Sequence, residues 1–297
     1  MIKKIDLHIH TTCSDGSLNP LEIIDEANKN GLDTISITDH DTINAYNSKL
    51  FNYAKKNNIN LITGVEISTK IKKCGIHVLG YNIDINNKEL IKRLKIIRNA
   101  RHDYLYNVSK KIEELGYIVR TDELDKIDAV TKAHIANDII SNEKNKVKLI
   151  KEFNHIPSKG EFIETIMNEG CPAYVKKEAI SPKEASDLIR KAGGKVVLAH
   201  PVAYTYEDNL TKEEIQNILS NMNADGVEAY YIYIDKNNKK HNNISIWKEF
   251  AKDNNKFITI GSDFHSKDNI HPTIGLINEK LNITEKELNE IIKNVNC

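Results

Sequence analysis

Short apolar runs rich in β-branched residues alternate along this chain with amphipathic stretches, and this alternation restricts the possible folds most strongly. We expect strands at residues 4–10, 33–38, 60–67, 75–81, 195–200, 225–231 and 257–262. Helix starts lie between them. Ser181 and Glu184 form a capping box around Pro182, and Thr211 and Thr284 begin similar boxes. Regular alternation of strands and helices favours a parallel sheet or barrel.

Length, charge and cysteine content exclude several classes of protein. A chain of 297 residues suits one large α/β domain or two ordinary ones. Basic and acidic residues number 42 each, so the overall charge indicates neither nucleic-acid nor membrane binding. The four cysteines form no CxxC pair, which argues against structural zinc and a disulfide framework. We find no signal peptide and no membrane-spanning run, and expect a cytoplasmic protein without an obligate protein partner.

The expected strands end in, or contain, side chains that bind metals. These are His8 and His10, His40, Glu66, His77, His200, and Asp263 with His265. A parallel barrel builds its active site at the carboxyl ends of its strands, so we expect these side chains at one mouth. Alternate residues of a strand share a face, which places His8 beside His10. That pair by itself is equally typical of ordinary histidines at the end of a strand.

The residue types indicate a hydrolytic metal site. Imidazoles and carboxylates without thiolates suit Zn, Mn or Fe at such a site. Burying so many titratable groups together is costly unless they pair or bind metal. We therefore predict a centre with several metal ions. For His200 the alternative is a structural role before Pro201.

The motifs DLHIHTTCSDGSLNP, ITDHDT, GVEIS, IHVLGY, LAHP and GSDFH occur in the order typical of one protein family. With them the chain resembles the PHP (polymerase and histidinol phosphatase) proteins. The resemblance implies an α/β fold, a distorted barrel of seven β/α units, with two to three divalent metal ions at its mouth. It implies the following ligands: His8, His10, Glu66 and Asp263 for the first metal; Asp15, His40 and His265 for the second; Glu66, His77 and His134 for the third. Asp15 stands where some family members have histidine.

Residues 86–171 lack a strong strand signal and begin with a long amphipathic stretch that ends at Gly116. This segment resembles the helical cap of one branch, the nucleoside 3′,5′-bisphosphate phosphatases and 5′-to-3′ exoribonucleases. The barrel domain would then comprise 1–85 and 172–297. That branch typically has Arg-Pro-His where this chain has Lys132-Ala133-His134. Lysine keeps the charge but lacks the fork that matches phosphate geometry.

The resemblance implies a metal-dependent phosphoesterase that acts on small nucleotides or short RNA. The expected substrates are nucleoside 3′,5′-bisphosphates, which would lose the 3′-phosphate, and 5′-phosphorylated RNA ends. A hydroxide bridging the metals would attack phosphorus. Lys132 and His200 would contact phosphate or leaving-group oxygens, and His200 is alternatively the general acid. Arg98 and Arg101 would reach a second phosphate or, alternatively, lie on a solvated helix face.

Other functions and roles stay open at this point. Histidinol-phosphate phosphatase would use the same chemistry, whereas an amidohydrolase generally has a bridging lysine where this chain has Glu66. A non-catalytic PHP scaffold for a partner such as a polymerase is the third alternative. Glu228 would orient a metal-binding histidine or simply be paired in its strand. Either a base of the substrate stacks on Tyr230, Tyr231 and Tyr233, or these aromatic residues are present only because strands favour them. We interpret the other histidines as ordinary surface or loop residues: His102, His155, His241 and His271.

Overall fold

The computed structural model describes residues 4–72, 74–127, 130–176, 179–235, 237–267, 272–277 and 279–296. The chain divides into two compact units. The first comprises Met1–Leu94 and Ile180–Cys297, and the second comprises Lys95–Ala179. Within the described ranges, no helix has both the length and the apolar character that crossing a membrane requires.

The first unit is built on one large sheet. Among the described residues its seven strands are, in spatial order, β1 (Ile5–Ile9), β2 (Thr34–Ile37), β3 (Asn60–Ile71), β4 (Cys74–Tyr81), β5 (Lys195–Leu198), β6 (Gly226–Tyr230) and β9 (Phe257–Ile260). Phe264, just after β9, forms a parallel bridge with Ile9 of β1, so the sheet nearly closes on itself. The expected strands and the distorted barrel are confirmed.

The direction of β4 differs from the expected parallel arrangement. β4 runs antiparallel to both β3 and β5, while the other neighbouring strands of this sheet are parallel. Ile71 pairs with Cys74, so only two positions separate β3 from β4. A parallel connection needs a crossover of a dozen residues or more, which this spacing excludes. The expectation that the candidate ligands lie at the carboxyl ends of parallel strands is therefore wrong for Glu66 and His77, which lie within this hairpin.

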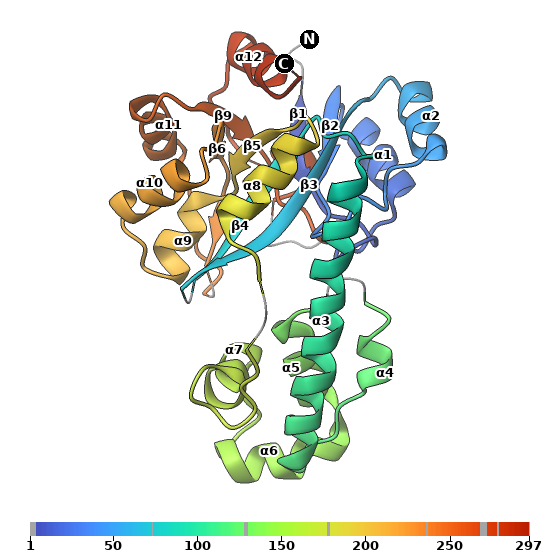
Figure 1. Ribbon diagram of the computed structural model, residues 1–297, viewed down its shortest axis with the longest axis vertical. Helices are drawn as coiled ribbons and strands as arrows, with labels where there is room; N and C mark the ends of the chain where they lie inside the picture. The colour runs from blue at the N-terminus through green and yellow to red at the C-terminus, as the bar shows by residue number, and fades with distance from the viewer. Residues whose placement is uncertain are drawn as a thin grey trace. The chain divides into compact units, whose positions relative to one another are not determined.

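Helices surround the outside of this sheet (Figure 1). They are α1 (Pro20–Lys29), α2 (Ser48–Lys56), α8 (Pro182–Lys191), α9 (Pro201–Glu207), α10 (Lys212–Asn221), α11 (Ile244–Asp253) and α12 (Glu285–Asn296). The unit also contains the short helix η3 (Ile274–Leu276) and a separate pair of strands, β7 (Tyr233–Ile234) and β8 (Lys240–His241). The predicted capping boxes form at Ser181 and Thr211, and the side chain of Thr284 accepts from the backbone of Glu287. Ile and Leu side chains of the sheet pack against these helices, which fixes the strand ends in place.

The second unit is helical in its described part. Its elements are α3 (Lys88–Glu114), which begins in the first unit, α4 (Thr121–Leu124), α5 (Lys132–Ser141), η1 (Glu143–Asn145), α6 (Lys146–Phe153), α7 (Lys159–Phe162) and the π-helical turn η2 (Ile163–Met167). The unit has its own core, which includes Leu105, Ile135 and Phe162. Gly116 follows α3 with a φ of +84°, which a glycine tolerates without strain and which ends the helix as predicted.

Candidate metal centre

Glu66 lies at the centre of a group of histidines. Within the described residues, five imidazoles lie next to its carboxylate: Oε2 is 3.3 Å from His8 Nε2, 3.2 Å from His10 Nε2 and 3.0 Å from His40 Nδ1, and Oε1 is 3.0 Å from His77 Nδ1 and 3.2 Å from His200 Nε2. Glu66, His8 and His10 are fully buried. Side chains from β1 and β4, and from the segments after β1, β2 and β5, therefore converge on one carboxylate of β3.

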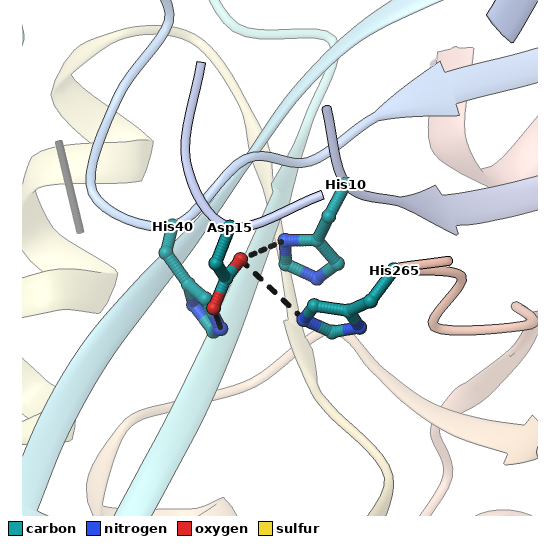
Figure 2. A group of neighbouring side chains, drawn as sticks. All are labelled: His10, Asp15, His40 and His265. Atoms are coloured by element: carbon teal, nitrogen blue, oxygen red, sulfur yellow. Dashed lines mark ion pairs between the residues drawn. The ribbon is translucent and has the colours of Figure 1, made fainter. Parts of the chain in front are cut away.

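The converging side chains form overlapping groups, each suited to hold a metal ion. In the part of the chain that the structure describes, the groups are His8, His10, Glu66 and Asp263; His10, Asp15, His40 and His265; and His40, Glu66 and His77. The ligand atoms of each group lie within 4.8 Å of one another. Figure 2 shows the second group, in which the carboxylate of Asp15 pairs with His10 and His265 on one side and with His40 on the other. His10 and His40 each belong to two groups, which the sequence alone did not predict.

Two buried aspartates shape the loops that hold the ligands. Asp39 accepts hydrogen bonds from the backbone N–H and hydroxyl of Thr11 (both 2.7 Å) and from Ser14 (2.6 Å), which fixes the loop after β1. Asp6 accepts from the backbone N–H and hydroxyl of Ser262, at 3.0 and 2.6 Å, and thus fixes the segment after β9. Sequence reasoning missed both residues, although each is part of a quoted motif, DLHIH or ITDHDT.

A third acid, Glu228 of β6, orients the histidines directly. Its carboxylate lies 3.0 Å from His8 Nδ1, and it accepts from the backbone N–H of His200 at 2.9 Å. A proton on His8 Nδ1 leaves Nε2, the atom that faces Glu66, free to bind a metal. Similarly, His265 Nδ1 donates to the carbonyl oxygen of Asp263 (2.9 Å), which leaves Nε2, 3.4 Å from Asp15 Oδ1, as the ring atom suited to a metal. The structure supports the orienting role of Glu228.

The buried charges shift one another's pKa values. Burial alone would raise the pKa of Glu66, but electrostatic interaction with the neighbouring histidines outweighs burial and holds that pKa well below its ordinary value. Burial alone would lower the pKa of His10, yet Asp263 and Glu66 raise it to about 10. His10 therefore holds a proton that a bound metal would have to displace.

Several candidate ligand atoms are available to a metal ion because they face one another but make no hydrogen bond within the described part of the chain. Among the described residues, His8 Nε2, Asp15 Oδ1, His40 Nδ1, Glu66 Oε2 and His77 Nδ1 are buried without a hydrogen-bond partner. Buried polar atoms are normally hydrogen-bonded, and such atoms are costly unless something else satisfies them. A donor set of imidazole nitrogen and carboxylate oxygen is what Zn, Mn and Fe bind. The chemistry and the burial of these atoms therefore fit divalent metal ions.

His200 lies beside the groups just described. Its ring centroid is 5.7 Å from that of His8, 5.5 Å from that of Tyr204 and 5.4 Å from that of Tyr231. The hydroxyl of Tyr204 accepts from the backbone N–H of His77 at 2.9 Å. Neither Tyr204 nor this contact was predicted, because nothing in the local sequence indicates that α9 reaches β4.

The aromatic residues after β6 have different surroundings. Tyr230 is buried in the core, and its hydroxyl lies 2.9 Å from Lys248 Nζ, so stacking of a base on Tyr230 is excluded. The hydroxyl of Tyr231 donates to Asp263 Oδ2 at 3.2 Å. Tyr233 stacks on Tyr206 at 5.5 Å between ring centroids. Of the histidines interpreted as ordinary, His102, His155 and His241 pair with Asp125, Glu161 and Asp235, and His271 lies outside the described residues.

The remaining candidate residues belong to the second unit. Lys132 Nζ donates to Asn168 Oδ1 at 2.9 Å. His134 completes a capping box at the start of α5, where its backbone N–H donates to Thr131 Oγ1 at 3.3 Å. Arg101 is only 3% exposed, which excludes a solvated helix face for this residue. The roles assigned to these residues and to Arg98 at the metal centre stay predictions.

The sequence is similar to those of two curated enzymes. A 5′-3′ exoribonuclease of Haemophilus influenzae is 29% identical over 270 residues, which cover 89% of this chain and 91% of that protein. A 3′,5′-nucleoside bisphosphate phosphatase of Chromobacterium violaceum is 25% identical over 266 residues, which cover 88% of this chain and 87% of that protein.

A solved structure shares the fold of this chain, and a family model matches its sequence. A solved structure from Bifidobacterium adolescentis, named for a metal-dependent phosphoesterase, superimposes with a TM-score of 0.72 at 21% identity. The superposition covers 99% of this chain and 97% of the Bifidobacterium chain. At this identity the likeness shows the fold alone. The family model described as the PHP domain matches residues 6–194, more than half of the chain, and this confirms the resemblance inferred from the motifs. The chain belongs to the PHP domain family.

Proposed function

We propose that this protein is a metal-dependent phosphoesterase that acts on small nucleotides or the 5′ ends of RNA. The main support is the buried carboxylate of Glu66, which histidines surround on both oxygens and whose Oε2 has no hydrogen-bond partner among the described residues. Divalent metals at such a centre supply a nucleophile at neutral pH and neutralise the charge of a phosphate ester. The names of the two curated relatives support the same reaction class.

The proposed ligands extend the assignment made from the motifs. The first ion would be held by His8, His10, Glu66 and Asp263, and the second by Asp15, His40 and His265 together with His10. A third would be held by Glu66, His77 and His40. His134 is proposed as a further ligand on the resemblance alone. Two or three ions of Mn, Zn or Fe satisfy these donors.

His200 is the proposed substrate contact of the first unit. Its Nε2 lies 3.2 Å from Glu66 Oε1, and its Nδ1 is buried without a hydrogen-bond partner in the described part of the chain. The residue has a φ of +23°, a strained value, and it directly precedes Pro201 at the start of α9. A histidine fixed in this way can either bind a non-bridging phosphate oxygen or donate a proton to the leaving oxygen.

Residues 86–171 are proposed as a cap that supplies positive charge to the substrate. Lys132 would touch a phosphate, and Lys132→Ala should then lower kcat/KM by about 30-fold to 150-fold, which corresponds to about 2–3 kcal/mol for a lost charged contact. Lys132→Arg should retain or improve activity, because arginine makes two parallel hydrogen bonds to phosphate. Steady-state kinetics of both variants measure this. Unchanged kinetics for Lys132→Ala would show that Lys132 has been misassigned.

The substrate is proposed to have two phosphates. Lys132, Arg98 and Arg101 would bring more positive charge to the site than the hydrolysis of one phosphate monoester needs, so a second phosphate would serve as an anchor. Nucleoside 3′,5′-bisphosphates would lose the 3′-phosphate, and a 5′-phosphorylated RNA would be cut after its first nucleotide.

A side-by-side assay with manganese tests this choice. It compares adenosine 3′,5′-bisphosphate, adenosine 3′-monophosphate, histidinol phosphate and a 5′-phosphorylated oligoribonucleotide. The bisphosphate should exceed the 3′-monophosphate at least about tenfold in kcat/KM, or about 1.4 kcal/mol. If histidinol phosphate is the best substrate, or the 5′-phosphate makes no difference, the anchoring idea is wrong and only the phosphoesterase assignment is left.

A further inference from the structure

A pocket of about 360 Å³ lies beside the metal groups, in the first unit. Its described lining comes from the segment that follows β6, from the segment after β9 and from the end of α9. Tyr231, Tyr233 and Ile234 line it together with Asp263, His265 and Glu207. The volume is at the lower end of the range for small-ligand sites, which suits a ligand the size of one nucleoside.

The pocket shares a wall with the proposed ligands of two metal ions. Asp263 Oδ1 faces His8 Nε2 at 3.2 Å and His10 Nε2 at 3.1 Å, while Asp263 Oδ2 accepts from Tyr231 at 3.2 Å. His265 lines the pocket and also faces Asp15 at 3.4 Å. A substrate whose phosphate occupies the metal groups would therefore have its adjoining part next to Tyr231.

The described lining suits an uncharged, partly aromatic ligand better than a second phosphate. Tyr231, Tyr233 and Ile234 offer apolar surface, and the stacking of Tyr233 on Tyr206, with an angle of 15° between the rings, holds its ring in place. The carboxylate of Glu207 repels an anion but accepts hydrogen bonds from amino and hydroxyl groups. Burial and the nearby Glu207 raise the pKa of Tyr233, so its hydroxyl keeps its proton.

We infer that this pocket binds the nucleoside of the substrate, its base and ribose, and that Glu207 and Tyr233 determine its preference. The inference rests on the proposed phosphoesterase function and adds to it the place of the uncharged part of the substrate. It also separates two tasks, because the anchor for a second phosphate must then lie outside this pocket.

The test compares adenosine 3′,5′-bisphosphate with an abasic 3′,5′-bisphosphate in which hydrogen replaces the base. The manganese-loaded enzyme should prefer the nucleotide at least about tenfold in kcat/KM, which is within the energy of one stacked base. Ile234→Trp, which fills the pocket, should bring the ratio close to one. Glu207→Gln should lower the ratio at least threefold, and because Glu207 is exposed this variant should fold normally. The matched control Glu213→Gln, an exposed acid on α10, should keep the wild-type ratio.

The outcomes separate the inference from the proposed function. Equal hydrolysis of both bisphosphates by the wild type, or an unchanged ratio in Ile234→Trp and Glu207→Gln, overturns the nucleoside pocket but leaves the phosphoesterase intact. Hydrolysis of neither bisphosphate counts against the proposed function. Calorimetric titration with adenosine 5′-monophosphate, which needs no hydrolysis, then decides the inference: weaker binding to Ile234→Trp than to Glu213→Gln supports it, and equal binding overturns it.

Discussion

Glu66→Gln is expected to lose most of the bound metal and at least about 1,000-fold in kcat, or about 4 kcal/mol of transition-state stabilisation. The amide keeps the size of the side chain but lacks the negative charge that two metal groups share. Removing an outer contact of a metal typically costs 10-fold to 100-fold, so loss of a shared ligand should cost more. Metal content by elemental analysis and kcat with adenosine 3′,5′-bisphosphate measure the two effects.

The fold should survive this change, because β3 is hydrogen-bonded to β2 and to β4 on its two sides. Circular dichroism should therefore be close to that of the wild type. Asp138→Asn is the matched control, since Asp138 is also a buried carboxylate but pairs with Arg120 in the second unit. The control should keep its metal. Wild-type turnover and metal content in Glu66→Gln would show that Glu66 does not bridge metals.

The strands could be predicted from the sequence, but the direction of one of them could not. β-branched runs report where a buried strand lies, and seven such runs became the strands of the described sheet. Apolar periodicity contains no information on direction, so β4 was expected to be parallel. The signal that was available is the short gap between the expected strands at 60–67 and 75–81, which cannot hold the dozen or more residues of a parallel crossover.

The side chains of the candidate metal groups could be proposed from the sequence because their residue types are unusual at strand ends. Asp39 and Asp6 were missed because they make no direct contribution to the ligand groups. They accept hydrogen bonds from the loops that carry the candidate ligands. The contact between the Tyr231 hydroxyl and Asp263 was likewise not predicted. Such contacts join segments that are distant in sequence, such as Asp6 and Ser262, and only the fold brings them together.

His10 and His77 differ in how many metal groups they join, and this difference gives the second large prediction. His10 belongs to the group of His8 and Glu66 and also to the group of Asp15, whereas His77 belongs to one group. The motifs alone assigned His10 to a single metal. Buried between Asp15 and Asp263, at 3.6 Å and 3.1 Å, His10 faces carboxylates on both sides through its two ring nitrogens.

Accordingly, His10→Ala should lower the metal content by about two ions per chain, and His77→Ala by about one. The loss of kcat/KM should be about 1,000-fold or more for His10→Ala and about 100-fold for His77→Ala, or about 4 and 3 kcal/mol. His155→Ala, which removes an exposed histidine of the second unit, should match the wild type in both measurements. Elemental analysis after dialysis against a weak chelator gives the metal content. Equal metal loss in His10→Ala and His77→Ala would contradict the shared role of His10, because a residue that joins two groups must weaken both when it is removed.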